Sequence, residues 1–280
     1  MQAFTKSVLF TCLMLMATAS FAGFPIGKNR WLLAPSYNLY NAKGYWDKGR
    51  QYSGYSNSGK FTSHYFGFYG GTGISDKADL VFNVPFVISS YQETGLTQTN
   101  SSLGDASVGI SYLLNDFDYY KFLSVTGSLI IPLYNNSAGK LPTIGYAKPG
   151  AEVKLGFSGT NRTRLKNTYW DISAGIRQFF DSVGPTQVFF DALFGMPLDE
   201  SWKLTVTLSS NNSTSRNRDF DPNNPFINRY YSTFRITPAL SRKINETTSI
   251  NFSVFADLSG KNIGRGTGAA VTGIIKFGTR

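Results

Sequence analysis

The sequence is short of the residues that most enzyme and metal sites need. Among its 280 residues are one cysteine, Cys12, and one histidine, His64. Cys12 lies in an apolar stretch that we expect to be removed, which excludes disulfides and cysteine-based sites from the mature chain. A nucleophilic serine needs a base, and His64 directly follows Ser63, so the two point to opposite faces of a strand. We therefore expect no catalysis, no metal and no other cofactor, and we expect His64 to be a hydrogen-bonded residue of a lumen or rim.

No apolar run is long enough to cross a bilayer as a helix. Lys6 precedes an apolar run from Val8 to Met16, far short of the roughly 20 residues that a spanning helix needs. Ser20-Phe21-Ala22 then offers small residues at the two positions that a signal peptidase reads. We expect residues 1–22 to be a secretory signal peptide and residues 23–280 to be one domain.

Charged residues are scarce, and acidic ones more so. They make up 16% of the chain, and 17 acidic against 27 basic residues give a formal net charge of +10. Aromatics reach 15%, and the mean hydropathy is -0.16. A transmembrane barrel has this composition, because apolar positions that face lipid alternate with polar positions that face the lumen. A basic balance can indicate nucleic acid, but an exported barrel has no such partner, and outer-membrane lipid and lipopolysaccharide match the charge better.

Twelve short segments in which apolar and polar residues alternate run from Asn29 to Phe277. In the clearest of them, one face carries Trp202, Leu204, Val206 and Leu208, and the other carries Lys203, Thr205, Thr207 and Ser209. One such face suits lipid and the other suits water. The aromatic stretch Tyr65–Tyr69 fits less well and predicts a bulge or a plugging cluster.

Short and long connectors alternate along the chain. The short ones are 75–78, 115–120, 161–168, 199–201 and 245–247, and the long ones are 41–60, 93–105, 134–150 and 211–228. Residues 182–187 are short where a long loop is expected. Outer-membrane barrels place short turns in the periplasm and long loops outside. The sequence therefore predicts an all-β, transmembrane, antiparallel up-and-down barrel of about 12 strands in the cell outer membrane, with both termini periplasmic.

Most of the charge within these segments falls on the polar face. The candidate lumen and permeation residues are Glu152, Lys154, Asp171, Arg177, Asp191, Lys203, Arg235, Asp257 and Lys276. A symmetric hairpin around Glu246 would place Arg235 opposite Asp257, and Arg177 is expected within one step of Asp191. Such pairs either form a constriction that screens solutes by charge or fill a narrow interior, and we favour the structural interpretation.

Three prolines lie in apolar strand contexts, although proline cannot donate to the hydrogen-bond ladder. Pro85, Pro132 and Pro197 should mark kinks, bulges or strand ends. A wall opening is the functional alternative, and strand termination at the rim is the favoured one.

Aromatic residues near segment ends predict interfacial girdles. The candidates are Trp31, Trp170, Trp202, Tyr112 and Tyr230. Packing within a core is the alternative.

One segment carries a family resemblance. Leu103-Gly104-Asp105-Ala106-Ser107-Val108-Gly109 resembles the Gly-Asp strand start of the outer-membrane barrels named for the meta-pathway of phenol degradation, which are relatives of the FadL-type channels. Ile131-Pro132-Leu133, followed by a long loop, is similar to the proline-ended strand of that family. The resemblance implies transport of hydrophobic or aromatic small molecules. The chain departs from the FadL type in having only residues 23–28 before the first strand, and it ends with Arg280 instead of an aromatic.

The sequence thus predicts a passive, monomeric outer-membrane channel for small hydrophobic or aromatic compounds. A non-conducting structural or adhesive barrel is the main alternative. An outer-membrane hydrolase is the weakest, because no motif surrounds any serine and no Asp precedes His64.

Overall fold

The computed structural model describes residues 25–136, 140–161, 168–224 and 227–278. The expected leader, 1–22, lies outside the described residues. Fourteen strands follow one another: β1 (Arg30–Trp46), β2 (Tyr52–Gly54), β3 (Lys60–Gly73), β4 (Ala78–Glu93), β5 (Leu96–Leu103), β6 (Asp105–Phe117), β7 (Lys121–Pro132), β8 (Gly150–Asn161), β9 (Thr168–Phe179), β10 (Thr186–Pro197), β11 (Trp202–Thr214), β12 (Tyr231–Lys243), β13 (Thr248–Lys261) and β14 (Ile263–Gly278). One turn of 3-10 helix, Ser56–Ser58, lies between β2 and β3. Within the described residues, no helix is long and apolar enough to cross a membrane.

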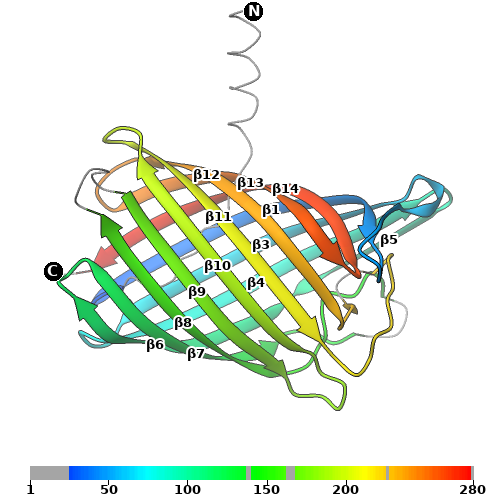
Figure 1. Ribbon diagram of the computed structural model, residues 1–280, viewed down its shortest axis with the longest axis horizontal. Helices are drawn as coiled ribbons and strands as arrows, with labels where there is room; N and C mark the ends of the chain where they lie inside the picture. The colour runs from blue at the N-terminus through cyan, green and yellow to red at the C-terminus, as the bar shows by residue number, and fades with distance from the viewer. Residues whose placement is uncertain (1–24, 137–139, 162–167, 225–226, 279–280) are drawn as a thin grey trace, which may run out of the picture.

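The strands form a closed antiparallel barrel (Figure 1). β1 pairs with β3 on one side and with β14 on the other, which closes the sheet. Among the described strands, β2 pairs only with β1, and β5 pairs only with β4. Removing these two from the fourteen leaves a wall of twelve strands, so the predicted antiparallel barrel of about 12 strands is confirmed.

The wall is apolar outside and polar inside. On β11, Thr205 and Thr207 are 6% and 2% exposed, whereas Leu208 is 37% exposed. On β9, Ser173 is 2% exposed and its neighbour Ile172 is 42% exposed. This is the reverse of a soluble protein, in which apolar side chains are buried. The alternation predicted from sequence gives the barrel an apolar outer belt that faces lipid.

The connectors divide the barrel into two ends. The end with connectors 74–77, 118–120, 198–201 and 244–247, together with the start of β1 and the end of β14, is called the turn end. The opposite end, called the loop end, carries connectors 47–59, 94–104, 133–149 and 215–230, together with the short links 180–185 and Asn262. Figure 1 shows β5 at the loop end and the C-terminus at the turn end. The alternation of short and long connectors holds, apart from these two tight links.

The prolines differ in their positions. Pro132 and Pro197 end β7 and β10, as expected. Pro85 lies inside β4, between Asn83, which pairs with β6, and Phe86, which pairs with β5. One neighbouring strand ends there and another begins, so the missing N–H of Pro85 falls where the ladder changes partners.

The aromatic stretch of β3 contains no bulge. Its register with β1 and β4 is continuous through Tyr65 and Tyr69, so the bulge expected there is wrong. Tyr65 and Tyr69 face the lumen, where they line the main cavity. Phe66 and Phe68 face outward and are 44% and 42% exposed. Aromatic residues thus occur on both faces of β3, with tyrosines, whose hydroxyls are polar, in the lumen and phenylalanines toward lipid.

Candidate functional site: the barrel lumen

A cavity of about 1290 Å³ occupies the lumen. Seven of the nine charged residues assigned to the lumen from sequence line it: Glu152, Lys154, Asp171, Arg177, Arg235, Asp257 and Lys276. The other two lie on inward faces beside it. Asp191 is opposite the buried Ser173, and the Lys203 ammonium lies over the Tyr169 ring, 5.8 Å from its centroid. The cavity is therefore bordered by charges of both signs.

Arg235 and Asp257 form one inward pair. They are directly opposite in the β12–β13 register, which confirms the symmetric hairpin. Arg235 Nε donates to Asp257 Oδ1 at 2.7 Å, and the backbone N–H of Gly266 donates to Oδ2 at 3.2 Å. The guanidinium carbon lies 4.1 Å from the centroid of the Phe255 ring. The Asp257 side chain is only 2% exposed, so the carboxylate belongs to the wall and the arginine reaches into the lumen.

Arg177 has a different partner from the one expected. It is opposite Glu152 on β8 and Gln187 on β10, four residues from Asp191. Its Nε and Nη2 donate to Glu152 Oε2 at 2.8 and 2.5 Å. The expected proximity of Arg177 to Asp191 was wrong, because the β9–β10 hairpin turns two residues earlier, with Phe179 N–H bonded to the Pro185 carbonyl.

The Arg177 contacts continue along the wall. Arg177 Nη1 donates to Gln187 Oε1 at 3.3 Å, and Gln187 Nε2 donates to the Tyr231 hydroxyl at 3.1 Å. Asn211 Nδ2 donates to the same hydroxyl at 3.1 Å. Side chains from β8 to β12 thus form one chain of hydrogen bonds. This network holds the guanidinium in place on the lumen wall.

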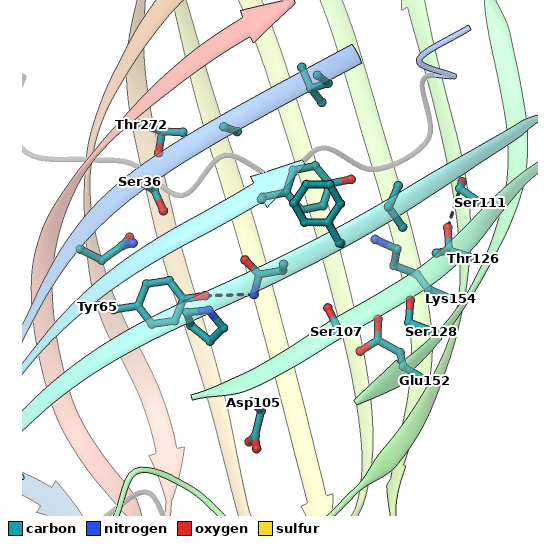
Figure 2. A pocket seen from close by; sticks show the side chains of 18 of the residues that line it. Ser36, Tyr65, Asp105, Ser107, Ser111, Thr126, Ser128, Glu152, Lys154 and Thr272 are labelled. Carbon is teal, nitrogen blue, oxygen red and sulfur yellow. Dashed lines mark hydrogen bonds between the residues drawn. The ribbon is translucent and has the colours of Figure 1, made fainter. Parts of the chain in front are cut away.

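Hydroxyl groups also line the cavity, some of them directly opposite the charged residues in the register, and the list of candidates, which followed charge, omitted them. Figure 2 shows Ser36, Ser107, Ser128 and Thr272 directed into the cavity, with Thr126 donating to Ser111 at 3.1 Å. Aromatic rings lie among them, and the inward ones that line the cavity are Tyr40, Tyr65, Tyr69, Phe179 and Phe255. The inward positions of the alternating pattern, read for serine and threonine, would have identified the hydroxyls.

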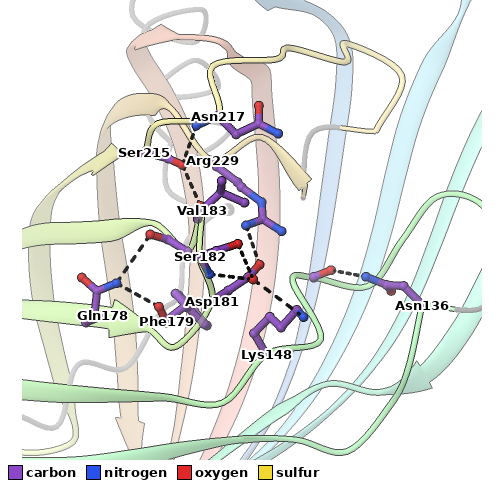
Figure 3. A network of polar contacts seen from close by, with 12 residues as sticks. Asn136, Lys148, Gln178, Phe179, Asp181, Ser182, Val183, Ser215, Asn217 and Arg229 are labelled. Atoms are coloured by element: carbon purple, nitrogen blue, oxygen red, sulfur yellow. Dashed lines mark hydrogen bonds and ion pairs between the residues drawn. The ribbon is translucent and has the colours of Figure 1, made fainter.

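At the loop end, contacts between connectors cross the mouth (Figure 3). Asp181 accepts a hydrogen bond from Arg229 Nη1 at 2.9 Å, and Lys148 Nζ lies 3.9 Å from its other oxygen. The Arg229 hydrogen bond lowers the pKa of Asp181. The Tyr146 hydroxyl donates to the Asn228 carbonyl at 2.9 Å, and burial raises the pKa of Tyr146. Connectors 133–149, 180–185 and 215–230 are thereby tied together.

At the turn end, the residues before β1 enter the lumen. Pro25 and Ile26 line the cavity, and the Ile26 N–H donates to Asp79 Oδ2 at 2.9 Å. The bridge between Lys28 and Gly73 fixes the same segment to β3. The described residues before β1 therefore border the turn-end part of the cavity.

Four of the five aromatic candidates lie at the turn end. Trp31 stacks on Phe277, with centroids 6.2 Å apart, and is 41% exposed. Tyr112 pairs with the first residue of β4, and Trp170 and Trp202 lie at the starts of β9 and β11. Tyr230 is at the loop end, where its hydroxyl accepts a hydrogen bond from Lys261 Nζ at 3.2 Å.

The features needed for catalysis are separated. His64 forms a hydrogen bond of 2.8 Å between its Nδ1 and the Tyr37 hydroxyl, as expected, but it shares the outward face of the exposed Phe66, so the expected place in the lumen was wrong. Ser63 points inward and is 4% exposed. No group of three or more metal-binding side chains occurs within the described residues.

Comparison with known proteins gives a likeness of fold. No protein-family model matches the sequence, and no curated protein is similar to it in sequence. The COG4313 outer membrane channel from Pseudomonas putida F1 superposes with a TM-score of 0.73 at 11% identity, over 93% of this chain and 100% of that one. The beta domain of the Bordetella autotransporter BrkA gives 0.55 at 9% identity, over 89% and 100%. The translocator domain of the Neisseria meningitidis autotransporter NalP gives 0.52 at 10% identity, over 99% and 94%.

The fold shared with these barrels and the exposed apolar belt together place the chain in the outer membrane. These three solved structures are an outer membrane channel and two autotransporter domains, and identities of 9 to 11% carry the likeness no further than the fold.

Proposed function

We propose that the chain is a passive, non-enzymatic outer-membrane channel for small hydrophobic or aromatic compounds. The observation that carries the proposal is the cavity of about 1290 Å³ inside a closed barrel. Twelve strands lie between the eight that side chains fill and the 16 or so that enclose a broad aqueous pore. A space of this volume exceeds the roughly 300–1,000 Å³ of a typical small-molecule pocket, so small solutes fit inside it.

The lining supports aromatic compounds as the solute class. Tyr40, Tyr65 and Tyr69 present rings to the same space as the hydroxyls of Ser107 and Ser128. Rings stack on an aromatic solute, and hydroxyls accept or donate to a polar substituent. The Gly104-Asp105 resemblance to the family named for phenol degradation points to the same class.

The two inward pairs limit selectivity by charge. Arg235 is held by Asp257, and Arg177 is held by Glu152. Paired charges present little net field to a passing ion, so the channel should favour neutral solutes over ions. We further propose that the loop end faces outside, with both termini periplasmic, and that the barrel is a monomer surrounded by lipid and lipopolysaccharide.

A matched pair of variants tests permeation. Ser128 lines the cavity, and its neighbour Gly127 has open space where a Cβ would lie, on the outward face of the same strand. Liposomes containing the wild type or Gly127→Trp should swell faster with small aromatic alcohols than with sugars of similar size. Ser128→Trp should abolish that difference. Equal swelling by all three proteins, or no swelling above empty liposomes, would reject the proposal.

The tied connectors support one alternative, a non-conducting barrel whose loops bind a partner. Asn224 Oδ1 accepts from both the N–H and the hydroxyl of Thr143 at 3.1 Å, and Asn224 is 3% exposed. Such contacts close part of the mouth. Planar-bilayer recordings without any conductance step in the wild type, with normal folding, would favour this alternative.

A further inference from the structure

A second cavity lies outside the lumen, at the loop end of the seam that closes the barrel. It is a shallow groove of about 340 Å³ on β14 and the strands on either side of it. Figure 1 shows β13, β14 and β1 side by side. Outward side chains that border the groove are Asn41, Lys43, Tyr52, Ala256, Leu258, Arg265 and Thr267. Nothing in the proposed permeation path uses this surface.

The groove lies at the level of the lipid headgroups. Phe277, at the turn end of β14, is in the aromatic girdle, and Arg265 is 277 − 265 = 12 residues away on the same outward face. At about 3.3 Å per residue and a tilt of about 40°, this is about 30 Å along the barrel axis. The apolar band of an outer-membrane barrel is about 25 Å tall. Arg265 is therefore just beyond the apolar band, at the opposite interface.

Two cations meet in this groove. Lys43 lies in the β1 bulge between Ala42, which pairs with Gly266, and Tyr45, which pairs with Gly264, so it is opposite Arg265. Like charges placed across a strand pair are destabilising. Neither Lys43 nor Arg265 takes part in an ion pair within the described residues.

The surroundings hold the guanidinium in place without neutralising it. The Arg265 guanidinium carbon lies 4.9 Å from the centroid of the Tyr52 ring and 5.8 Å from that of Trp46. The acid that borders the groove is Asp257, and its side chain faces inward to Arg235. Two exposed cations without an acidic partner among the described residues, at a membrane interface, offer a site to an anion from outside the chain.

We propose that this groove binds a phosphorylated lipid of the outer leaflet, through a phosphate of the lipid A part of lipopolysaccharide. Lys43 and Arg265 would bind the phosphate, since charge-assisted hydrogen bonds to phosphate are the strongest available to them. Leu258, 53% exposed, borders the groove, and Phe252 and Val271 continue its apolar side toward the turn end at 47% and 37% exposed. Acyl chains attached to the phosphorylated headgroup would lie along that side. The proposal rests on the orientation proposed above, with the loop end outside.

The test uses the full barrel, purified in detergent from outer membranes. Binding of lipid A with both phosphates is measured for the wild type, for Lys43→Gln combined with Arg265→Gln, and for Lys77→Gln combined with Lys121→Gln. The last variant loses the same charge at the turn end, where Lys77 and Lys121 are exposed. Dephosphorylated lipid A and inorganic phosphate are the comparison ligands. The heat-induced mobility shift on gels checks that each variant is folded.

We expect the groove variant to lose at least about tenfold in affinity for lipid A, because it loses both charge-assisted contacts. The turn-end variant should bind like the wild type, and dephosphorylated lipid A should bind like the groove variant. Equal binding of lipid A with and without phosphates would overturn the proposal in favour of non-specific apolar contact. Competition by millimolar inorganic phosphate would overturn it in favour of a free-anion site, and loss only in the turn-end variant would place the lipid elsewhere.

Conductance separates this proposal from the channel function. The groove is outside the lumen, so the groove variant should conduct like the wild type. A barrel that binds lipid A through Lys43 and Arg265 but conducts nothing would refute the channel and leave the lipid site standing.

Discussion

The Arg235–Asp257 pair should be strongly asymmetric in its effect on stability. Asp257 is nearly fully buried, and the Arg235 side chain is 29% exposed. Removing the cation leaves a buried carboxylate with only the Gly266 N–H as a donor. Removing the carboxylate leaves a guanidinium that can reach the lumen and still lies over Phe255. The two single variants should therefore differ, although they break the same ion pair.

The magnitudes follow from that difference. Removing one partner of a buried ion pair lowers stability by about 3–5 kcal/mol. Water in the lumen can partly solvate the carboxylate that is left, so we expect Arg235→Met to lower stability by about 3 kcal/mol, the lower limit of that range. Asp257→Asn keeps a carbonyl oxygen to accept from Arg235 and should cost about 1–2 kcal/mol, the loss of one charge-assisted hydrogen bond. The double variant contains no orphaned charge, so it should recover about 1–3 kcal/mol relative to the sum of the single losses.

The assay is equilibrium unfolding of the barrel in urea, in vesicles, followed by the gel mobility shift. Planar-bilayer reversal potentials serve as a second measurement, because the double variant keeps the net charge of the lumen and should keep the ion selectivity. Equal losses for the two single variants, or losses that simply add, would refute the buried-carboxylate argument. A large change in reversal potential in the double variant would show that the pair selects ions.

Three further outcomes are expected. Lys48→Cys at the loop end should react with an impermeant thiol reagent on intact cells, whereas Glu200→Cys at the turn end should react only after the outer membrane is permeabilised; the reverse would invert the orientation. Arg177→Gln should shift ion selectivity away from anions in bilayer recordings more than Arg235→Met does, because the Arg177 side chain is 36% exposed and that of Arg235 is 29% exposed. Equal shifts would show that side-chain exposure to the lumen does not determine the effect on selectivity. The pKa of Asp181 is lowered, so its contact with the Arg229 guanidinium should be present above the ordinary carboxyl pKa of about 3.9 and be lost as pH falls through the lower folded value. Channel closures tied to the loops should therefore not change between pH 8 and 5 and should change only below about pH 4, and an earlier change would implicate another group.

The sequence was sufficient for the barrel because its alternation is local. A period of two residues assigns each side chain to lipid or lumen without any knowledge of distant strands. The same two-residue alternation explains why the predicted ion pairs across strands were only partly correct. The β12–β13 hairpin is symmetric about Glu246, so Arg235 and Asp257 were matched correctly. The β9–β10 hairpin turns two residues earlier than expected, which kept Arg177 on the lumen face but gave it Glu152 as its partner.

Other errors arose where a residue was assigned by its type alone, without asking which face of the strand its side chain occupies. His64 was assigned to the lumen or rim because histidine is polar, although it is in phase with Phe66, which faces lipid. Residues 93–105 were interpreted as a loop, although Leu96–Leu103 pairs with the extended end of β4. An exposed hairpin beyond the membrane needs no apolar face, so its sequence carries no alternation to detect.

Whether the lumen conducts depends on contacts that no local pattern encodes. Thr143 and Asn224 are 81 residues apart, and Tyr146 and Asn228 are 82 apart, yet their hydrogen bonds tie connectors 133–149 and 215–230 together across the mouth. The residues next to each of these four include a polar or turn-forming one, as in any surface loop. The local sequence therefore gives no sign of the distant partner. The wall is determined by periodicity and the mouth by tertiary contacts. The proposed channel function therefore depends on the part of the chain whose structure is hardest to infer from sequence, and under that proposal variants in the connectors should alter conductance without altering the barrel.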